Sequence, residues 1–472
     1  MPRAGWVKPE NDQRLSDHVA IGVLTRTFPP DLVDAVLADT GRLQQRSRLL
    51  PARLVTYYVL ALALFSSLGY EEVMRSLVEG LAWESGWRQA WRVPSQPALS
   101  QARNRLGAEP LAELFARACL PLATPGTPGS FWRGLRLVAI DGTTLDVPDT
   151  PANAEAFGRP ASGRGSGEGA YPKLRLVALA ECGTHAMFAA AMGANTTGEA
   201  TLARELAGSL GTGMLVLADR YFCAHPLYSA FAATGADLCW RAKSNASLPV
   251  LERLGDGSYR SELVASDDKA TRARVTPVRV VEYEIADPGR PKGETLRYRL
   301  VTTLADPDQA PAAELAALYA QRWEFETALD ELKTHQRGAG VVLRSKAPDG
   351  VRQEAWGYLC THYAIRALMA EAADDQGIDP DRISFTRSLA AARRSVRAGL
   401  GAKTTTLTVA VVGVVAEIAR VLVPKRRLRA AARVVKRKMS NYGVKRAEHR
   451  GWPQPTCRPE QAVAVLGLGA GP

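Results

Sequence analysis

The chain has 472 residues and an ordinary apolar fraction of 46%, enough for several folded domains. Lysine and arginine total 60 against 48 acidic residues, and the formal charge of +12 favours an anionic partner, most commonly nucleic acid. A basic surface that serves only solubility is the alternative. The six cysteines are scattered, which argues against a disulfide framework and against a zinc ribbon.

Two apolar stretches, residues 54–68 and 407–423, are candidates for membrane spans. The first is too short to cross a bilayer, and the second carries Glu417 and Arg420. Both are predicted to be buried helices. The N-terminus lacks the apolar segment of a signal peptide. We therefore expect a cytoplasmic, nucleoid-associated protein without a membrane partner.

Residues 1–130 are predicted to be a mainly helical, DNA-binding region, with helices near residues 32–40, 54–65 and 70–83. A short helix at residues 98–107 carries several polar side chains that suit a DNA groove: Ser100, Gln101, Arg103, Asn104 and Arg105. An ordinary solvated helix explains the same pattern equally well.

Residues 131–350 change to short apolar runs that alternate with helical segments, which is typical of a layered α/β domain. Strands are predicted at residues 135–140, 174–180, 185–193 and 214–218, and a helix at residues 198–211 precedes the last of them. Alternating, β-prone runs within residues 245–305 predict a small β insertion. A long amphipathic helix follows at residues 312–335.

Residues 351–472 are predicted to be a helical C-terminal region with a basic tail. The tail holds eleven cations and one acid, Glu448: Lys425, Arg426, Arg427, Arg429, Arg433, Lys436, Arg437, Lys438, Lys445, Arg446 and Arg450. Like charges at this density repel one another, so a contact with the DNA backbone is favoured over a merely solvated tail.

Two carboxylates follow apolar strands of the α/β region. Asp141 is predicted to end one strand and Asp219 another. Ligands of open α/β sheets lie outside such strand ends, and two adjacent carboxylates need a cation such as Mg²⁺ between them. Asp146 is a rival to Asp141, but an odd step of five residues turns it to the other face of the strand. Asp149 is interpreted as a turn residue.

A third carboxylate lies on the long helix. Tyr319, Arg322, Glu326 and Lys333 fall within an arc of about 60°. This polar stripe suits contacts with a metal and with phosphates. A solvent-exposed ion pair between Arg322 and Glu326 is the alternative. Two neighbouring acids that lie off the stripe or at its edge are predicted to be surface charges: Glu324 and Asp330.

The three acids together, in their local motifs, form a specific pattern. Asp141 in IDGTTLDVPDT, Asp219 in LADRYF and the Tyr319–Arg322–Glu326–Lys333 spacing resemble bacterial DDE transposases, and more narrowly the insertion-element-four group (IS4 family). The resemblance also covers FPPDLVDAVLADTG and ALSQARNRLG, so it spans most of residues 20–370.

The resemblance implies an α/β ribonuclease H-like catalytic core with a β-strand insertion, flanked by mainly helical N- and C-terminal regions. It also implies that Asp141, Asp219 and Glu326 are the catalytic residues and the ligands of two Mg²⁺ ions, with Mn²⁺ as a substitute. The implied activity is cut-and-paste transposition by phosphodiester hydrolysis and strand transfer. The implied route passes through hairpin ends, during which a base is flipped out.

The resemblance further implies that the protein binds double-stranded DNA, namely the terminal inverted repeats of the element and its target, as a dimer on DNA. The implied DNA-binding residues are Tyr319, Arg322, Lys333, Arg220, Tyr221, Arg241 and Lys243. One feature departs from the family. Residues 245–305 lack the tryptophan that some relatives stack on the flipped base, and Tyr298 is the candidate substitute.

Two other functions remain compatible with the sequence. One is a ribonuclease H-like DNA endonuclease that cleaves without strand transfer. The other is a catalytically idle relative that only binds DNA, against which the complete set of three acids argues.

Overall fold

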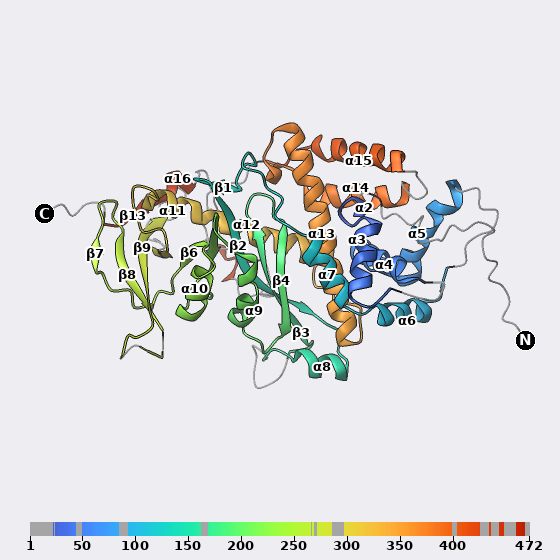
Figure 1. The fold of residues 1–472 in the computed structure, drawn as a ribbon, viewed down its shortest axis with the longest axis horizontal. Helices are drawn as coiled ribbons and strands as arrows, with labels where there is room; N and C mark the ends of the chain where they lie inside the picture. Colours follow the sequence, from blue (N-terminus) through green and yellow to red (C-terminus); the bar gives the residue numbers. More distant parts are fainter. Residues whose placement is uncertain are drawn as a thin grey trace, which may run out of the picture.

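The computed structural model describes residues 22, 24–43, 50–84, 93–161, 169–265, 267–268, 271–285, 297–398, 404–424, 434–435, 443–447 and 459–467. Most of the predicted basic tail, residues 425–450, lies outside the described residues. Figure 1 shows a central β-sheet with the N-terminal helices at one end and the strands of residues 252–302 at the other.

The described strands mostly join one 11-stranded sheet in the order β4-β3-β2-β5-β6-β10-β9-β8-β7, with β1 on β2 and β13 on β9. Their bounds are β1 (Phe131–Trp132), β2 (Leu135–Asp146), β3 (Lys173–Glu181), β4 (Met187–Ala194), β5 (Met214–Ala218), β6 (Asp237–Arg241), β7 (Glu252–Arg253), β8 (Tyr259–Val264), β9 (Val275–Ile285), β10 (Arg297–Thr302) and β13 (Val463–Val465). A separate parallel pair comprises β11 (Val434–Val435) and β12 (Gly443–Val444).

Strand pairing in the sheet changes from antiparallel to parallel at β2. Strands β2, β3 and β4 are antiparallel, β2, β5 and β6 are parallel, and β10, β9, β8 and β7 continue from β6 in antiparallel order. The four predicted strands of the α/β region are therefore present. The β-prone runs predicted within residues 245–305 form β7 to β10. These strands extend the same sheet beyond β6 (Figure 1).

Helices fill the N-terminal region and cover the sheet. Those of the N-terminal region are α2 (Leu24–Thr27), α3 (Pro30–Asp39), α4 (Ala52–Leu64), α5 (Tyr70–Glu84), α6 (Gln96–Leu106) and α7 (Glu109–Ala118). Within the α/β region lie α8 (Pro151–Phe157), α9 (Glu199–Glu205), η1 (Ala207–Ser209), α10 (His225–Ala232), α11 (Ala312–Leu318), η2 (Tyr319–Arg322), α12 (Trp323–Asp330) and η3 (Glu331–Gln336). The C-terminal region adds α13 (Pro348–Gln376), η4 (Pro380–Arg382), α14 (Phe385–Ala398), α15 (Thr404–Ala419) and α16 (Pro459–Ala462).

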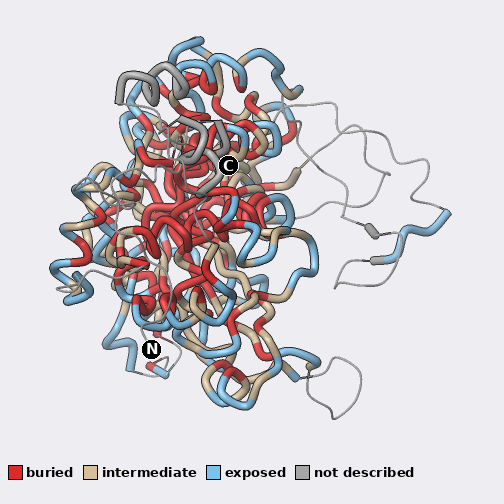
Figure 2. Tube along the Cα trace, turned by 90° about the vertical axis from the view of Figure 1, so that its right-hand side faces the viewer, coloured by how far each residue is buried: buried red, intermediate tan, exposed pale blue. Residues whose placement is uncertain are grey.

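The two faces of the sheet pack against different cores. Leu137 and Leu145 of β2 point into the larger core, which includes α13 and the N-terminal helices, whereas Val138 and Ile140 point into the core beneath α9 and α10. Figure 2 shows buried residues running continuously through the middle of the molecule. Because side chains alternate along a strand, Asp141 lies on the face of the larger core, where α12 packs against β2.

Two sequence predictions need correction. The strand that contains Asp141 does not end there, because β2 continues to Asp146 by pairing with β3. The C-terminal region is not purely helical, because β13 pairs with β9 and so joins the sheet.

The two apolar stretches form α4 and α15. Residues 54–64 are buried, as predicted, whereas the second stretch is only partly buried, because Val412 is 63% exposed. In the described part of the chain, no helix combines the length and the apolar character needed to cross a membrane.

Candidate active site

Asp141 lies where the parallel part of the sheet opens. The ladder between β2 and β5 ends at the pair Ile140–Ala218, whereas Asp141 still pairs with Ala178 of β3. Among the described residues, no strand pairs with this edge of β2 from Asp141 onward. The Oδ1 atom of Asp141 accepts a hydrogen bond from the amide of Gly142 at 2.8 Å, which fixes the carboxylate beside this opening.

Asp219 comes directly after β5, as predicted from the apolar run before it. Its Oδ1 atom accepts a hydrogen bond of 2.5 Å from the amide of Arg220. Because β2 and β5 are neighbouring parallel strands, their ends bring Asp219 to the same edge as Asp141.

The third acid is carried by a helical segment that is continuous but not uniform. The predicted single helix consists of α11, the 3₁₀ turn η2, α12 and the π-type turn η3. Tyr319 anchors this segment to the sheet, because its buried hydroxyl donates to the carbonyl of Ala218 at 3.1 Å. The hydroxyl thus has a partner inside the protein, immediately before Asp219.

Arg322 connects two of the acids. Its guanidinium donates to Oδ2 of Asp141 at 3.3 Å and to Oε1 of Glu326 at 3.0 Å. The Arg322–Glu326 pair is therefore present, but the alternative of a solvent-exposed pair is wrong because Arg322 is only 4% exposed. A buried cation thus stands between the two carboxylates.

The electrostatics of Asp141 show that the three acids influence one another. Burial raises the pKa of Asp141 to about 6, and the negative charges of Glu326 and Asp219 add to this rise. The Arg322 guanidinium and the Gly142 amide act in the opposite direction. The site therefore holds more negative charge than Arg322 alone compensates, a condition that favours a further cation.

The donor set fits a divalent cation such as Mg²⁺, because all three side chains offer carboxylate oxygens. Their oxygens are not yet gathered into one coordination sphere: among the described residues, only His185, Glu324 and Asp381 bring three ligand atoms within 4.8 Å of one another. The guanidinium of Arg322, bonded to both Asp141 and Glu326, accounts for part of that spacing.

Lys333 is the last residue of the polar stripe and lies on η3, the turn that follows α12. Its Nζ atom donates to Oγ1 of Thr143 at 2.8 Å, and burial followed by the charges of Arg337 and Lys173 lowers the pKa of Lys333. Thr143 was not singled out from the sequence. Its position two residues after Asp141, and hence on the same face of β2, is the signal that identifies it.

Other predicted DNA-binding residues surround this opening. Arg220 and Tyr221 follow Asp219 and are exposed, Tyr221 by 65%, and the Arg220 guanidinium lies 5.4 Å from the Tyr221 ring centroid. At the end of β6, Arg241 is half-buried and Lys243 is exposed. These side chains remain accessible to a polyanion.

Tyr298 is already packed on both sides. Its ring stacks on Tyr283 of the neighbouring strand β9, with a centroid distance of 5.2 Å and an interplanar angle of 18°. From the other neighbouring strand, β6, the Arg241 guanidinium lies 4.3 Å from the Tyr298 centroid. A flipped base can stack on Tyr298 only after one of these partners moves.

The rival acids near Asp141 have other partners. Asp146 forms a 2.9 Å ion pair with Lys173 across β2 and β3, and Asp149 pairs with Arg159. Asp330 is exposed, as predicted. The prediction of a surface charge is wrong for Glu324, whose Oε2 atom lies 2.9 Å from Nε2 of the buried His185.

The proposed groove-reading role of Arg103 is also wrong. Arg103 of α6 is buried and donates to Gln353 at 2.9 Å, to the Tyr70 hydroxyl at 2.7 Å and to Ser345 at 3.0 Å. It therefore fastens α6 to α13. Of the other side chains predicted to suit a DNA groove, Gln101, Asn104 and Arg105 are exposed.

Comparison with known proteins gives two family matches along the chain. Residues 18–116 match the family described as "Insertion element 4 transposase N-terminal", and residues 132–363 match "Transposase DDE domain". The second match implies a ribonuclease H-like fold, in line with the mixed sheet and its helices.

Among individual proteins, the chain is 29% identical over 439 residues to "Transposase InsG for insertion sequence element IS4" of Escherichia coli (strain K12), covering 92% of this chain and 94% of that one. It is 26% identical over 240 residues to "Putative transposase InsZ" of the same organism, covering 51% and 77%. The solved structure "Cryo-EM structure of piggyBac transposase synaptic complex with hairpin DNA" aligns with a TM-score of 0.41 and 11% identity over 83% of this chain and 84% of that chain. On the family matches and the relation to InsG, the chain belongs to the insertion-element-four family of DDE transposases.

Proposed function

We propose that this protein carries out cut-and-paste transposition of an insertion sequence by metal-dependent phosphodiester hydrolysis and strand transfer at Asp141, Asp219 and Glu326. The observation that carries the proposal is the buried guanidinium of Arg322, which hydrogen-bonds to both Asp141 and Glu326. A cation held between two acids, beside a third at the end of β5, is an arrangement suited to phosphate chemistry.

The three acids would hold the divalent ions, two Mg²⁺ with Mn²⁺ as a substitute. When bound, these ions supply an activated water or 3′-hydroxyl and stabilise the leaving oxygen. Burial is the main cause of the raised pKa of Asp141, and the negative charges of Glu326 and Asp219 add to the rise. Those two charges support the assignment, because each of them also attracts a metal cation.

Three side chains of the stripe would organise the site. Arg322 compensates the charges of Asp141 and Glu326, and its own charge also attracts a phosphate. Tyr319 fixes the helix at the end of β5 and so positions Asp219 relative to Glu326. Lys333, held by Thr143, offers its ammonium to the DNA backbone.

The DNA partner would be the double-stranded terminal inverted repeats and then the target. Arg220 and Tyr221 lie next to Asp219 on the exposed side, and Arg241 and Lys243 lie at the end of β6. Two DNA ends must be brought together for transposition, so a dimer on DNA is expected. The helical residues 1–130 and the basic tail would add sequence-independent phosphate contacts.

The hairpin route stays a prediction. Of the aromatic side chains in β7 to β10, Tyr298 has the position predicted for base stacking, but it lies between Tyr283 and Arg241. Release of Arg241 toward a phosphate would uncover one face of the ring for a base. The partition of the chain at residues 130 and 350, with an insertion at 245–305, is likewise a proposal.

A strand-transfer assay tests the proposal. The full chain is incubated with Mg²⁺, DNA that carries the terminal repeats and a supercoiled target plasmid. Joined products are expected. Cleaved ends without joining would instead identify an endonuclease, and end binding without cleavage would identify an idle DNA-binding relative.

A matched control distinguishes the loss of a metal ligand from damage to strand β2. Asp141→Asn is expected to abolish both cleavage and joining, whereas Asp146→Asn, on the same strand but paired with Lys173, should retain them. Equal loss in both variants would show that damage to β2, rather than loss of a metal ligand, explains the defect.

A further inference from the structure

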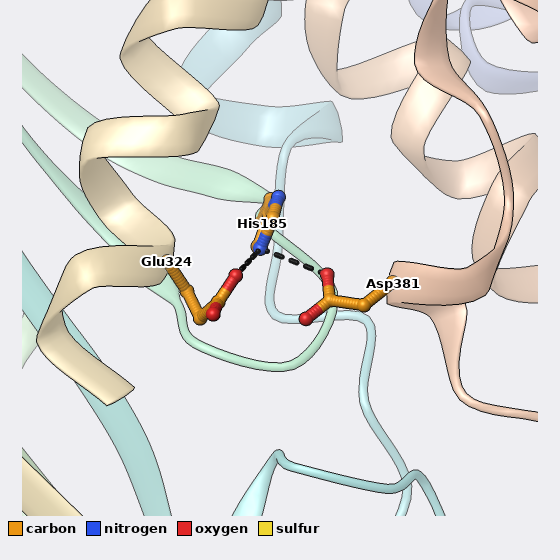
Figure 3. A group of neighbouring side chains, drawn as sticks. All are labelled: His185, Glu324 and Asp381. Carbon is orange, nitrogen blue, oxygen red and sulfur yellow. Dashed lines mark hydrogen bonds and ion pairs between the residues drawn. The ribbon is translucent and has the colours of Figure 1, made fainter. Parts of the chain in front are cut away.

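A second group of ionisable side chains lies apart from the proposed active site, behind α12. His185, in the turn between β3 and β4, stands between Glu324 of α12 and Asp381 of η4 (Figure 3). Its Nε2 atom lies 2.9 Å from Oε2 of Glu324 and 3.0 Å from Oδ1 of Asp381. One ring nitrogen therefore faces two carboxylates that come from segments far apart in the sequence.

The geometry matches that of metal ligands. One atom each of His185, Glu324 and Asp381 lies within 4.8 Å of the others. Zn²⁺ takes distances of about 2.0–2.2 Å to nitrogen and oxygen ligands, so the three side chains must rearrange around an ion placed between them. The side chains of these three residues are 0%, 14% and 18% exposed, which distinguishes the group from ordinary surface acids.

The second ring nitrogen provides an independent observation. His185 is fully buried, and its Nδ1 atom has no hydrogen-bond partner. The Oε1 atom of Glu331 lies 3.7 Å from that nitrogen. A histidine that binds a metal through one nitrogen ordinarily donates the other N–H to a carboxylate, which is the place that Glu331 occupies.

The charges of the cluster favour an added cation. Three carboxylates, those of Glu324, Glu331 and Asp381, surround His185, and the Arg366 guanidinium lies within 4 Å of Glu331 and Asp381. Burial and Arg366 lower the pKa of His185, but Asp381 and Glu324 outweigh them and raise it to about 10. The acids thus already attract one proton to Nε2.

We propose that Nε2 of His185 and the carboxylates of Glu324 and Asp381 bind a divalent transition-metal ion of the Zn²⁺ type. The ion replaces the proton on Nε2, which is released to solvent, and the Nδ1–H group then donates to Glu331. A nitrogen ligand favours Zn²⁺ over Mg²⁺.

Such an ion would be structural. It would tie α12, which carries Glu326 two residues after Glu324, to the β3–β4 turn and to η4 of the C-terminal region. This site goes beyond the proposed function and does not depend on it, because its ligands lie outside the three catalytic acids.

The test uses tag-free full-length protein, stripped with a chelator, in a background variant that carries Asp141→Asn and Glu326→Gln. This background removes carboxylate ligands of the proposed catalytic site. Titration calorimetry with Zn²⁺ is expected to show one ion bound per chain. Adding Asp381→Asn or Glu324→Gln should weaken binding by about tenfold or more, whereas Asp330→Asn, on the exposed side of α12, should leave it unchanged.

A spectroscopic readout identifies the ligand. Mn²⁺ bound to the background variant should show nitrogen modulation in its electron spin echo, because His185 supplies a nitrogen and the catalytic acids supply only oxygen. Circular dichroism checks that each variant is folded. Absence of Zn²⁺ binding to the folded background variant, or binding that Asp381→Asn and Glu324→Gln leave intact, would overturn the proposal and identify an ion-pair cluster only.

Discussion

Arg322 and Asp141 are joined by a 3.3 Å ion pair between a helical turn and a strand that are 181 residues apart in the sequence. The guanidinium of Arg322 is buried and also bonds to Glu326. Without it, two carboxylates would face each other in a poorly solvated site. Arg322 therefore determines how closely Asp141 and Glu326 approach in the metal-free protein.

Arg322→Ala is expected to lower the rate of DNA cleavage by about 10²–10³-fold, the usual effect of removing a charge aimed at a reacting phosphate. Mutual repulsion of Asp141 and Glu326 should also make the protein more dependent on Mg²⁺ for its thermal stability. Cleavage kinetics and melting with and without Mg²⁺ measure both effects. Arg204→Ala, exposed on α9, is the control and should behave like the wild type; a normal rate in Arg322→Ala would contradict the role given to this side chain.

Tyr319→Phe removes only the hydrogen bond to Ala218 and is expected to lower the free energy of unfolding by about 0.5–1.5 kcal/mol. Cleavage should slow while the affinity for element ends stays unchanged, because the hydroxyl positions the helix and does not contact DNA. Denaturant unfolding and gel-shift titrations measure the two quantities. A loss of affinity with unchanged stability would show that Tyr319 contacts DNA directly.

Arg103→Ala is expected to destabilise the protein by about 3 kcal/mol, since it breaks the hydrogen bonds of a buried charged group to Gln353, Tyr70 and Ser345. Arg105→Ala, exposed two residues later on α6, should leave stability unchanged and weaken end binding if this helix contacts phosphates. Thermal melting and fluorescence anisotropy separate the two variants. Equal stability of the two variants would contradict the role of Arg103 in holding α6 to α13.

Asp256 provides a prediction of pH dependence. Burial alone would raise its pKa, but hydrogen bonds from Ser258 and from the first amide of α11, Ala312, together with the charge of Arg279, hold it below the ordinary 3.8. The folded protein thus keeps this carboxyl ionised where the unfolded chain protonates it. Its stabilisation is full above pH 3.8 and disappears as the pH falls through the lower pKa of the folded protein.

Asp256→Asn is therefore expected to be less stable than the wild type at neutral pH, with a difference that narrows below pH 3.8. Urea unfolding at a series of pH values measures it. Asp267→Asn, in an exposed pair with Arg274, is the control and should have little effect at neutral pH. A difference for Asp256→Asn that widens as the pH falls would have the wrong sign.

Much of the candidate site could be predicted from local pattern. The run MLVLA reads as a buried strand because β5 is covered on both faces, and this places Asp219 at a strand end. The stripe from Tyr319 to Lys333 follows helical periodicity, and it contacts β2 and β5 through Arg322, Lys333 and Tyr319 despite the 3₁₀ and π turns.

The rest depends on contacts between distant segments, about which local pattern carries no information. Arg103 meets Gln353 across 250 residues, so the polar face of α6 could not reveal that one of its cations is buried. Glu324 meets His185 across 139 residues, and no spacing between them signals a common site. The continuation of β2 past Asp141 relies on its pairing with β3, because Thr143 and Thr144 carry little apolar signal.

Cleavage of terminal-repeat DNA by Glu326→Gln tests the central claim most directly. This change keeps the shape of the side chain and its place on α12 but removes a charge that bonds to Arg322 and would bind metal. The account predicts that the variant binds element ends with wild-type affinity and cleaves them at least about 10³-fold more slowly, while Asp330→Asn on the same helix cleaves normally. Wild-type cleavage by Glu326→Gln would contradict the assignment of the three acids.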